Sequence, residues 1–168
     1  ADVGGGMRLL GSATIENSTI SGNTANGWHG GGAFITDGVV NVTNSTVVNN
    51  SAFNPDEAVA GGLFVGTFTD ASATLNIQNS IVANNSDHGC FLAPFGAGAV
   101  ALNSLGNNVF TDGTCGSEAS DQIVGDPGLD VLADNGGPTL THALLEGSPA
   151  IDAANAVCPA TDQRGIAR

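Results

Sequence analysis

The sequence predicts an all-β fold, a right-handed parallel β-helix or solenoid of about four coils with an irregular C-terminal cap. Three segments, 13–23, 40–50 and 75–85, align residue for residue, and each contains an Asn-Ser step. A cluster of glycines precedes each segment, at 4–6, 30–32 and 61–62. Aliphatic residues recur at fixed offsets from these markers. A repeat that cannot bury its own apolar face must stack on its neighbours, so the chain is predicted to be a stack of coils.

The first strand of each coil is expected directly after the glycine cluster. Alternate side chains of a strand face the same way, so the first and third residues after the cluster should point inward. These residues are all apolar: Met7 and Leu9, Ala33 and Ile35, Leu63 and Val65.

The second strand should precede the Asn-Ser step, and the third should follow it. The apolar residues alternate before the step and change parity across it, as expected where a strand bends into the next face. The inward positions of these two strands are Ala13, Ile15 and Ile20, then Val40, Val42 and Val47, then Leu75, Ile77 and Val82. Residues at equivalent positions should lie in a single file through the stack.

Extra residues between the repeats fall at 51–60 and 66–72, where they would project as corner loops without disturbing the stack. Residues 99–105 form a fourth and weaker copy of the pattern. We therefore expect one structural domain, with β-helix coils at 1–115 and a cap at 116–168 that packs on the last coil and covers its open edge.

Two rows of asparagine recur in register, and both are predicted to form asparagine ladders. They are Asn17, Asn44 and Asn79, then Asn23, Asn50 and Asn85. Asn tolerates a left-handed backbone at sharp bends, and its amide can bond to the same amide in the next coil. N-glycosylation is the alternative, since several of these positions fit the acceptor pattern. The repeat itself generates most of these matches, so we favour the structural interpretation.

Cys90 and Cys115 lie about one coil apart in the sequence. Stacked coils are ~4.8 Å apart, a spacing that a disulfide can bridge. We expect this bridge, and with it an oxidising compartment. Reduced, buried thiols are the alternative. Cys158 would remain unpaired, which suggests a partner outside this segment.

The chain is strongly acidic, with a net charge of −13, three arginines and no lysine. Such a surface repels phosphate backbones and anionic lipids, so neither nucleic acid nor a membrane surface is an expected partner. No apolar run approaches the ~20 residues that a membrane-spanning helix needs.

Composition also argues against catalysis. A polysaccharide lyase needs a base and cations for its acidic substrate, but the chain has no lysine and no tyrosine. A glycoside hydrolase needs two carboxylates on one face. The acidic residues of the coils do not share a strand or occupy equivalent rows, and Asp56-Glu57 lies in an expected loop. The histidines, His29, His88 and His142, are scattered and are expected to be structural.

Two weaker site predictions remain. Asp121, Asp126, Asp130 and Asp134 concentrate negative charge in the cap, and their hard oxygens suit Ca²⁺, although no known calcium-binding loop pattern is present. No other cofactor is expected.

An outward row of the first strands contains Arg8, Phe34 and Phe64. Aromatic rings beside an arginine on a flat sheet could bind a sugar ring or a protein partner. The alternative, which we favour, is that a loop or the N-terminal arm covers these rings.

The C-terminal half contains distinctive motifs. They are Ser104–Asn108, Asp112–Cys115, the run from Leu132 to Leu144 with Asn-Gly-Gly-Pro at its centre, Gly147–Asp152, and Cys158–Gly165 with its Asp-Gln-Arg-Gly. Together with the repeats, which look like those of polymorphic outer-membrane proteins, these motifs resemble bacterial surface proteins of the "choice-of-anchor Q" type. In that group the chain usually continues past Asp-Gln-Arg-Gly to another cysteine and an anchoring region.

The resemblance implies secretion and a cell-surface location, and it implies no reaction. Our hypothesis is an extracellular structural or adhesive module without catalysis, which could contact a surface polysaccharide. The rivals are a carbohydrate-active enzyme and a subunit of a larger surface assembly or filament. The first coil lacks a cap, which predicts further chain or a partner subunit at that N-terminal edge.

Overall fold

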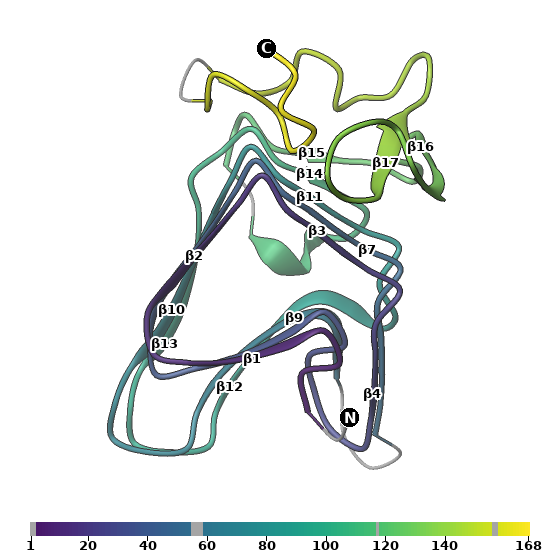
Figure 1. Cartoon of the computed structure of the whole chain (residues 1–168). Coiled ribbons are helices and arrows are strands. Elements are labelled where there is room, and N and C mark those ends of the chain that lie inside the picture. Colours follow the sequence, from purple (N-terminus) through teal and green to yellow (C-terminus); the bar gives the residue numbers. More distant parts are fainter. Residues whose placement is uncertain (1–2, 55–58, 117, 156–157) are drawn as a thin grey trace.

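The structure, a computed structural model, describes residues 3–54, 59–116, 118–155 and 158–168. Parallel strands stack into a β-solenoid of about four turns, as Figure 1 shows in a view along the stack. Three sheets form the sides of a triangle whose coils nearly superimpose. The sequence-based prediction of a stacked, nearly all-β fold is confirmed.

The first sheet contains the strands that follow the glycine clusters. In spatial order they are β1 (Met7–Leu10), β5 (Ala33–Thr36), β9 (Ala60–Thr67) and β12 (His88–Pro94). Leu9 pairs with Ile35, and Ile35 pairs with Val65, so the predicted alignment of the coils is correct.

The second sheet contains the strands before the Asn-Ser steps. They are β2 (Ala13–Glu16), β6 (Gly38–Thr43), β10 (Ala73–Gln78) and β13 (Val100–Ser104), the last being the weak fourth coil. Ile15 is in register with Val42, and Val42 with Ile77. These three residues therefore lie in the single file that the repeat predicts.

The third sheet follows the Asn-Ser steps. It contains β3 (Thr19–Ser21), β7 (Thr46–Val48), β11 (Ile81–Ala83), β14 (Val109–Phe110) and β15 (Gln122–Ile123). A short parallel pair, β4 (Thr24–Asn26) and β8 (Ser51–Phe53), lies at the corner between the third sheet and the next glycine cluster.

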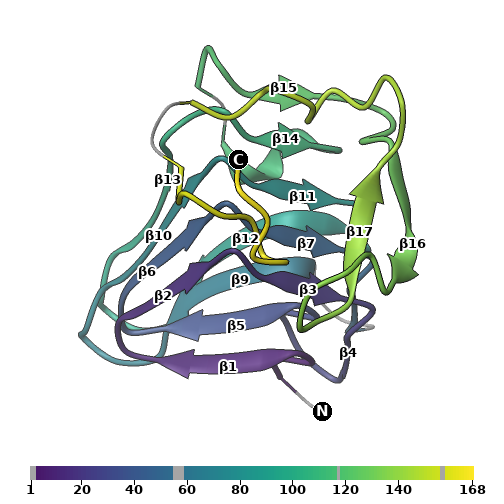
Figure 2. The same cartoon turned by 45° about the horizontal axis from the view of Figure 1, so that its top comes forward.

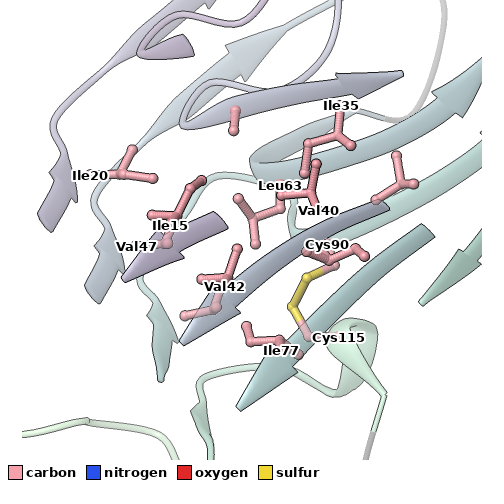
Figure 3. Close-up of a cluster of buried hydrophobic side chains, with 14 of the residues drawn as sticks. Ile15, Ile20, Ile35, Val40, Val42, Val47, Leu63, Ile77, Cys90 and Cys115 are labelled. Carbon is pink, nitrogen blue, oxygen red and sulfur yellow. A yellow bond between two sulfur atoms is a disulfide. The ribbon is translucent and has the colours of Figure 1, made fainter. Parts of the chain in front are cut away.

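The core fills the centre of the triangle. Every inward position that the repeat predicts belongs to one apolar cluster, of which Met7, Leu9 and Ala13 in the first coil are only partly buried. Figure 3 shows Ile15, Val42 and Ile77 in succession, with the Cys90–Cys115 disulfide beside them. Full burial of a large apolar side chain contributes roughly 1.5–3 kcal/mol, so these files are the main stabilising feature of the stack.

Glycine is required where successive coils come closest. A Cβ atom on Gly31 would overlap the carbonyl oxygens of Ser51 and Gly61, and one on Gly5 would lie 2.6 Å from the carbonyl oxygen of Gly31. The glycine clusters therefore allow backbone-to-backbone contact between coils, and they recur because the contact recurs.

The C-terminal part differs from the expected end cap. Strand β15 does extend the last coil, and the short 3₁₀ helix η1 (Gly113–Cys115) packs against β12 with Cys115 buried. Beyond these, the antiparallel strands β16 (Leu129–Ala133) and β17 (Thr141–Leu144) lie against the flank of the stack.

Residues 153–155 and 158–168, here called the C-terminal strap, run back along the same flank towards the first coil (Figure 2). There the Thr19 hydroxyl donates to Gln163 Oε1 at 2.7 Å, and Asn17 Nδ2 donates to the Thr161 carbonyl oxygen at 3.0 Å. The C-terminal segment beyond β15 thus covers the side of the solenoid, where Asn17, Asn79 and Asn107 form hydrogen bonds with it. The boundary at residue 115 stays a prediction.

Candidate functional site

The outward row on the first sheet has the predicted register. Arg8 pairs with Phe34, and Phe34 with Phe64, while Phe91 adds a further ring in β12. The rings of Phe34 and Phe64 stack at 4.9 Å between centroids. They are only 1% and 0% exposed, so these two rings are not themselves the accessible platform. The favoured alternative, a covered row, is what the structure shows.

A second layer of side chains covers the row. The ring of His29 stacks on Phe64 with centroids 4.3 Å apart, and Phe68 stacks on Phe34 at 6.0 Å. Val3, from the N-terminal arm, packs against the same cluster. The cover therefore comes from both of the sources that the sequence suggested, corner loops and the N-terminal arm.

The outer rim of this second layer is exposed. Trp28, Phe68 and Phe95, here called the aromatic patch, are 44%, 49% and 46% exposed. Phe68 and Phe95 stack at 5.1 Å, and Trp28 meets Phe95 edge to face at 6.4 Å. Phe68 and Phe95 come from the loops after β9 and β12, which project together at the lower left of Figure 1. Three half-exposed aromatic rings that are joined through Phe95 are typical of a binding surface.

These three rings lie outside the repeated strands, so the repeat did not predict that they form a surface. A signal was nevertheless present. Phe68 follows Phe64 at the same offset at which Phe95 follows Phe91. Two loops that leave equivalent strands and place an aromatic residue at the same offset should bring those rings together.

A shallow pocket of about 290 Å³ lies beside the patch, lined by Val3, Arg8, Trp28, Phe34 and Phe68. Arg8 is exposed, and its guanidinium carbon lies 6.0 Å from the centroid of the Phe34 ring. Within the described ranges, the Arg8 side chain makes no hydrogen bond or ion pair. By contrast, Arg164 makes an ion pair and hydrogen bonds with Asp162, and Arg168 makes a hydrogen bond with Asn17. The pocket thus combines apolar rings with a cation that is available to a ligand.

A second and more polar hollow of about 450 Å³ lies between the third sheet and the C-terminal strap, and Thr46, Asn44 and Arg164 contribute to its lining. His142 lines it too. Its Nδ1 lies 2.6 Å from the Asp130 carbonyl oxygen, which can only accept, so Nδ1 carries the proton. In the neutral ring, Nε2 then accepts from the Ser21 hydroxyl, at 2.8 Å. The bond to Ser21 ties the hairpin of β16 and β17 to the first coil, and the bond to Asp130 joins the two strands of the hairpin, in line with a structural His142.

Asp162 holds the turn of the strap. Partial burial opposes ionisation, but hydrogen bonds from the Arg164 side chain and from the backbone N–H groups of Ile166 and Arg164 outweigh it, together with the positive charge of Arg164. They lower the pKa of Asp162 below its ordinary value. Arg164 Nη2 lies 2.6 Å from Asp162 Oδ2. The pair is partly buried and serves the fold of the strap.

The two predicted asparagine rows behave differently. Asn23, Asn50 and Asn85 form a ladder, in which each side-chain amide donates to the next at 2.9 and 3.0 Å. In the other row Asn17 and Asn79 have left-handed backbones, as predicted, but they bond to the strap, as in the 3.1 Å contact from Asn79 Nδ2 to Asn155 Oδ1. The expectation of a ladder in that row is wrong, because corner side chains point outward.

A ladder that we did not predict joins Asn41, Asn76 and Asn103 on the outer face of the second sheet.

The predicted disulfide between Cys90 and Cys115 is present, with Cα atoms 4.9 Å apart. Cys158 is a free, half-buried thiol that donates to the Asn155 carbonyl oxygen at 3.1 Å. His88 is also engaged structurally, with Nδ1 3.1 Å from the Val59 carbonyl oxygen.

The carboxylates of the four candidate calcium ligands in the cap do not lie together around a common point. The carboxylates of Asp126, Asp130 and Asp134 each accept from a backbone N–H one or two residues further on, and Asp121 bonds to Asn108. In the part of the chain that the structure describes, no three metal-binding side chains lie together. The Asp56-Glu57 pair lies outside the described residues.

The chain matches no protein-family model, no curated protein sequence and no solved structure. The solenoid fold agrees with the resemblance to surface proteins of the choice-of-anchor Q type, but membership of that group stays a prediction. Among the described residues, no helix has the length and apolar character to cross a membrane.

Proposed function

We propose that the chain is a non-catalytic, extracellular adhesive module, which binds a surface polysaccharide through the aromatic patch. The observation that carries the proposal is the exposure of three contacting rings, Trp28, Phe68 and Phe95. Leaving large apolar side chains in water is unfavourable, and a sugar offers apolar C–H faces that aromatic rings contact well.

The support beneath the patch is rigid. Phe68 and Phe95 stack within 6.1 Å of the buried Phe34 or Phe64, whose strands are held on both sides by parallel neighbours. A preorganised surface loses little conformational entropy when it binds, which favours adhesion to a stiff polymer. The disulfide supports a secreted location, because such bonds persist in oxidising compartments.

The proposal is tested by retention of the chain on a panel of immobilised polysaccharides, neutral and acidic. Wild type and Phe53→Ala, which removes an exposed ring outside the patch, should be retained on the same polysaccharides. Trp28→Ala and Phe95→Ala should each lose retention. If no polysaccharide retains the wild type, or if the patch variants bind as it does, the adhesive function is wrong.

The same panel separates the enzymatic rival. Soluble oligosaccharides released over time by purified chain would identify a carbohydrate-active enzyme. A binding module should release none while it is retained.

A specific observation favours a second candidate, a part of a larger assembly. Strands β1, β2 and β3 end their sheets, so one edge of each is unpaired among the described residues. In the ladder of Asn23, Asn50 and Asn85, each side-chain amide donates toward the C-terminal end of the stack. Asn50 Oδ1 accepts from the backbone N–H and the side chain of Asn23, but no described residue donates to Asn23 Oδ1.

A further coil of the same type would supply the missing donors. We therefore propose that a parallel coil with Asn at this position, from additional chain or from a partner subunit, covers the N-terminal edge. Sedimentation analysis of the isolated chain tests self-association through this edge. A monomer at every concentration would exclude a second copy of this chain as that partner.

A further inference from the structure

We infer that the pocket beside the aromatic patch takes a carboxylated sugar ring, a uronic acid or a sialic acid, carried as an isolated charge on an otherwise neutral glycan. The inference rests on the proposed adhesive function and specifies its ligand. Arg8 lies at the rim of the pocket and is exposed.

Arg8 is suited to bind a carboxylate. Its guanidinium lies 6.0 Å from the Phe34 ring centroid, a contact that restricts the side chain but uses none of its N–H donors. No described residue gives Arg8 an ion-pair partner, although the sequence has sixteen acidic residues. A planar guanidinium with free donors binds a carboxylate through two parallel hydrogen bonds.

The remaining walls suit a single ring. Trp28 and Phe68 expose about half of their surface beside Arg8, and Phe34 forms the floor. The volume, about 290 Å³, is at the small end of the range for ligand pockets. One pyranose can place its apolar face on the rings and its carboxylate at Arg8. A protein partner would need a larger contact area than this pocket offers.

The overall charge restricts the polymer that carries the ring. With a net charge of −13, the chain repels densely charged polyanions at long range. A single carboxylate on a neutral glycan adds little repulsion, and it reaches the one arginine that the coils contain. The expected preference is thus for sparse charge, with both neutral glycans and polyuronates binding more weakly.

Trp28 provides a direct readout. It is the only tryptophan, and the chain has no tyrosine, so intrinsic fluorescence excited at the indole band reports on the pocket alone. Titrations should compare xylo-oligosaccharides with and without a glucuronic acid branch, lactose with sialyllactose, and an oligogalacturonate as the polyanion.

The expected result is a fluorescence change with at least one acidic member of a pair, at an affinity about tenfold or more above its neutral match. Arg8→Gln should remove this difference, so that the acidic member binds no better than its neutral match, while Arg8→Lys should keep part of it. Phe53→Ala should behave as the wild type. A common far-ultraviolet circular dichroism spectrum would show that the variants fold alike.

The outcomes separate the two proposals. Equal affinity for acidic and neutral members, or no effect of Arg8→Gln, would overturn the carboxylate inference while polysaccharide retention through Trp28 still supported adhesion. Tightest binding to the oligogalacturonate would overturn the preference for sparse charge. No binding to any probe, together with no retention on the polysaccharide panel, would overturn both proposals.

Discussion

Asn50 Oδ1 accepts two hydrogen bonds from Asn23, one from its backbone N–H at 3.0 Å and one from Nδ2 at 2.9 Å. Asn50 in turn donates to Asn85, and it is almost fully buried. One side chain therefore joins three coils. The polar ladder complements the aliphatic files, because it fixes the alignment of coils that apolar contact alone would hold less specifically.

The first prediction concerns this ladder. Asn50→Ala should lower the free energy of unfolding by about 2–4 kcal/mol, because it removes the acceptor of two Asn23 N–H groups and the buried hydrogen bond to the Ile20 carbonyl oxygen. Asn103→Ala, at the exposed end of the outer ladder, should cost less than about 1 kcal/mol. Water can take the place of the Asn103 amide as the donor to Asn76 Oδ1. Urea denaturation measures both variants, and equal effects would show that burial of the ladder does not matter.

The second prediction concerns the disulfide. Replacing both Cys90 and Cys115 by alanine should cost about 3 kcal/mol, from the larger conformational entropy of the unfolded chain. The bridge closes a loop with a sequence separation of 25 at the end of the core. Denaturation midpoints with and without reductant provide the measurement. Reductant should shift the wild-type midpoint and leave that of the double variant unchanged.

The third prediction concerns the glycine clusters. Gly31→Ala should destabilise the fold by about 3 kcal/mol or more, since its Cβ would overlap the backbone of two neighbouring segments. Gly125→Ala is the matched control, because nothing lies within 4 Å of a Cβ there and its backbone is not left-handed. Thermal unfolding should separate the two variants clearly, and a Gly31→Ala protein as stable as the control would contradict the proposed close contact.

The fourth prediction concerns the corner asparagines. Asn79→Gly keeps a left-handed backbone available but removes the bonds to Asn155, so the strap should loosen. Asn44→Gly is the control, because Asn44 Oδ1 is buried without a hydrogen-bond partner among the described residues. Limited proteolysis after residue 151 should be faster in Asn79→Gly only. Equal rates would mean that the strap is held by other contacts.

The fifth prediction concerns pH. The pKa of Asp162 is lower in the folded chain than its ordinary value of 3.8, so its stabilisation is complete above that value and is lost as pH falls through the folded pKa. The difference in melting temperature between wild type and Asp162→Asn should be constant from pH 7 to about 5 and shrink below about pH 4. A difference that persists at the lowest pH would show that ionisation of Asp162 is not the cause.

The repeat allowed the core to be predicted residue by residue. Ile15, Val42 and Ile77 share a file because the same offset recurs in each coil, and local alternation is enough to tell inward from outward positions. The disulfide followed from the same argument, since a separation of about one coil places two cysteines in adjacent layers.

The binding surface could not be predicted in this way. Trp28 and Phe95 meet at 6.4 Å although they leave different corners of different coils, and nothing in the repeat relates their positions. The path of the strap is a similar case. Asn17 and Thr161 are far apart in sequence, and they meet because a long segment turns back along the flank.

The amino-acid sequence by itself determined the stacked solenoid, its aliphatic files, the inner asparagine ladder and the disulfide, because each of these repeats with the period of the coil. Only the tertiary structure decided that Phe34 and Phe64 are covered, that Trp28, Phe68 and Phe95 form the exposed surface, and that the C-terminal strap binds the side of the stack. Those contacts join loops and a terminal segment that obey no period, so their positions depend on how the finished stack brings distant parts of the chain together.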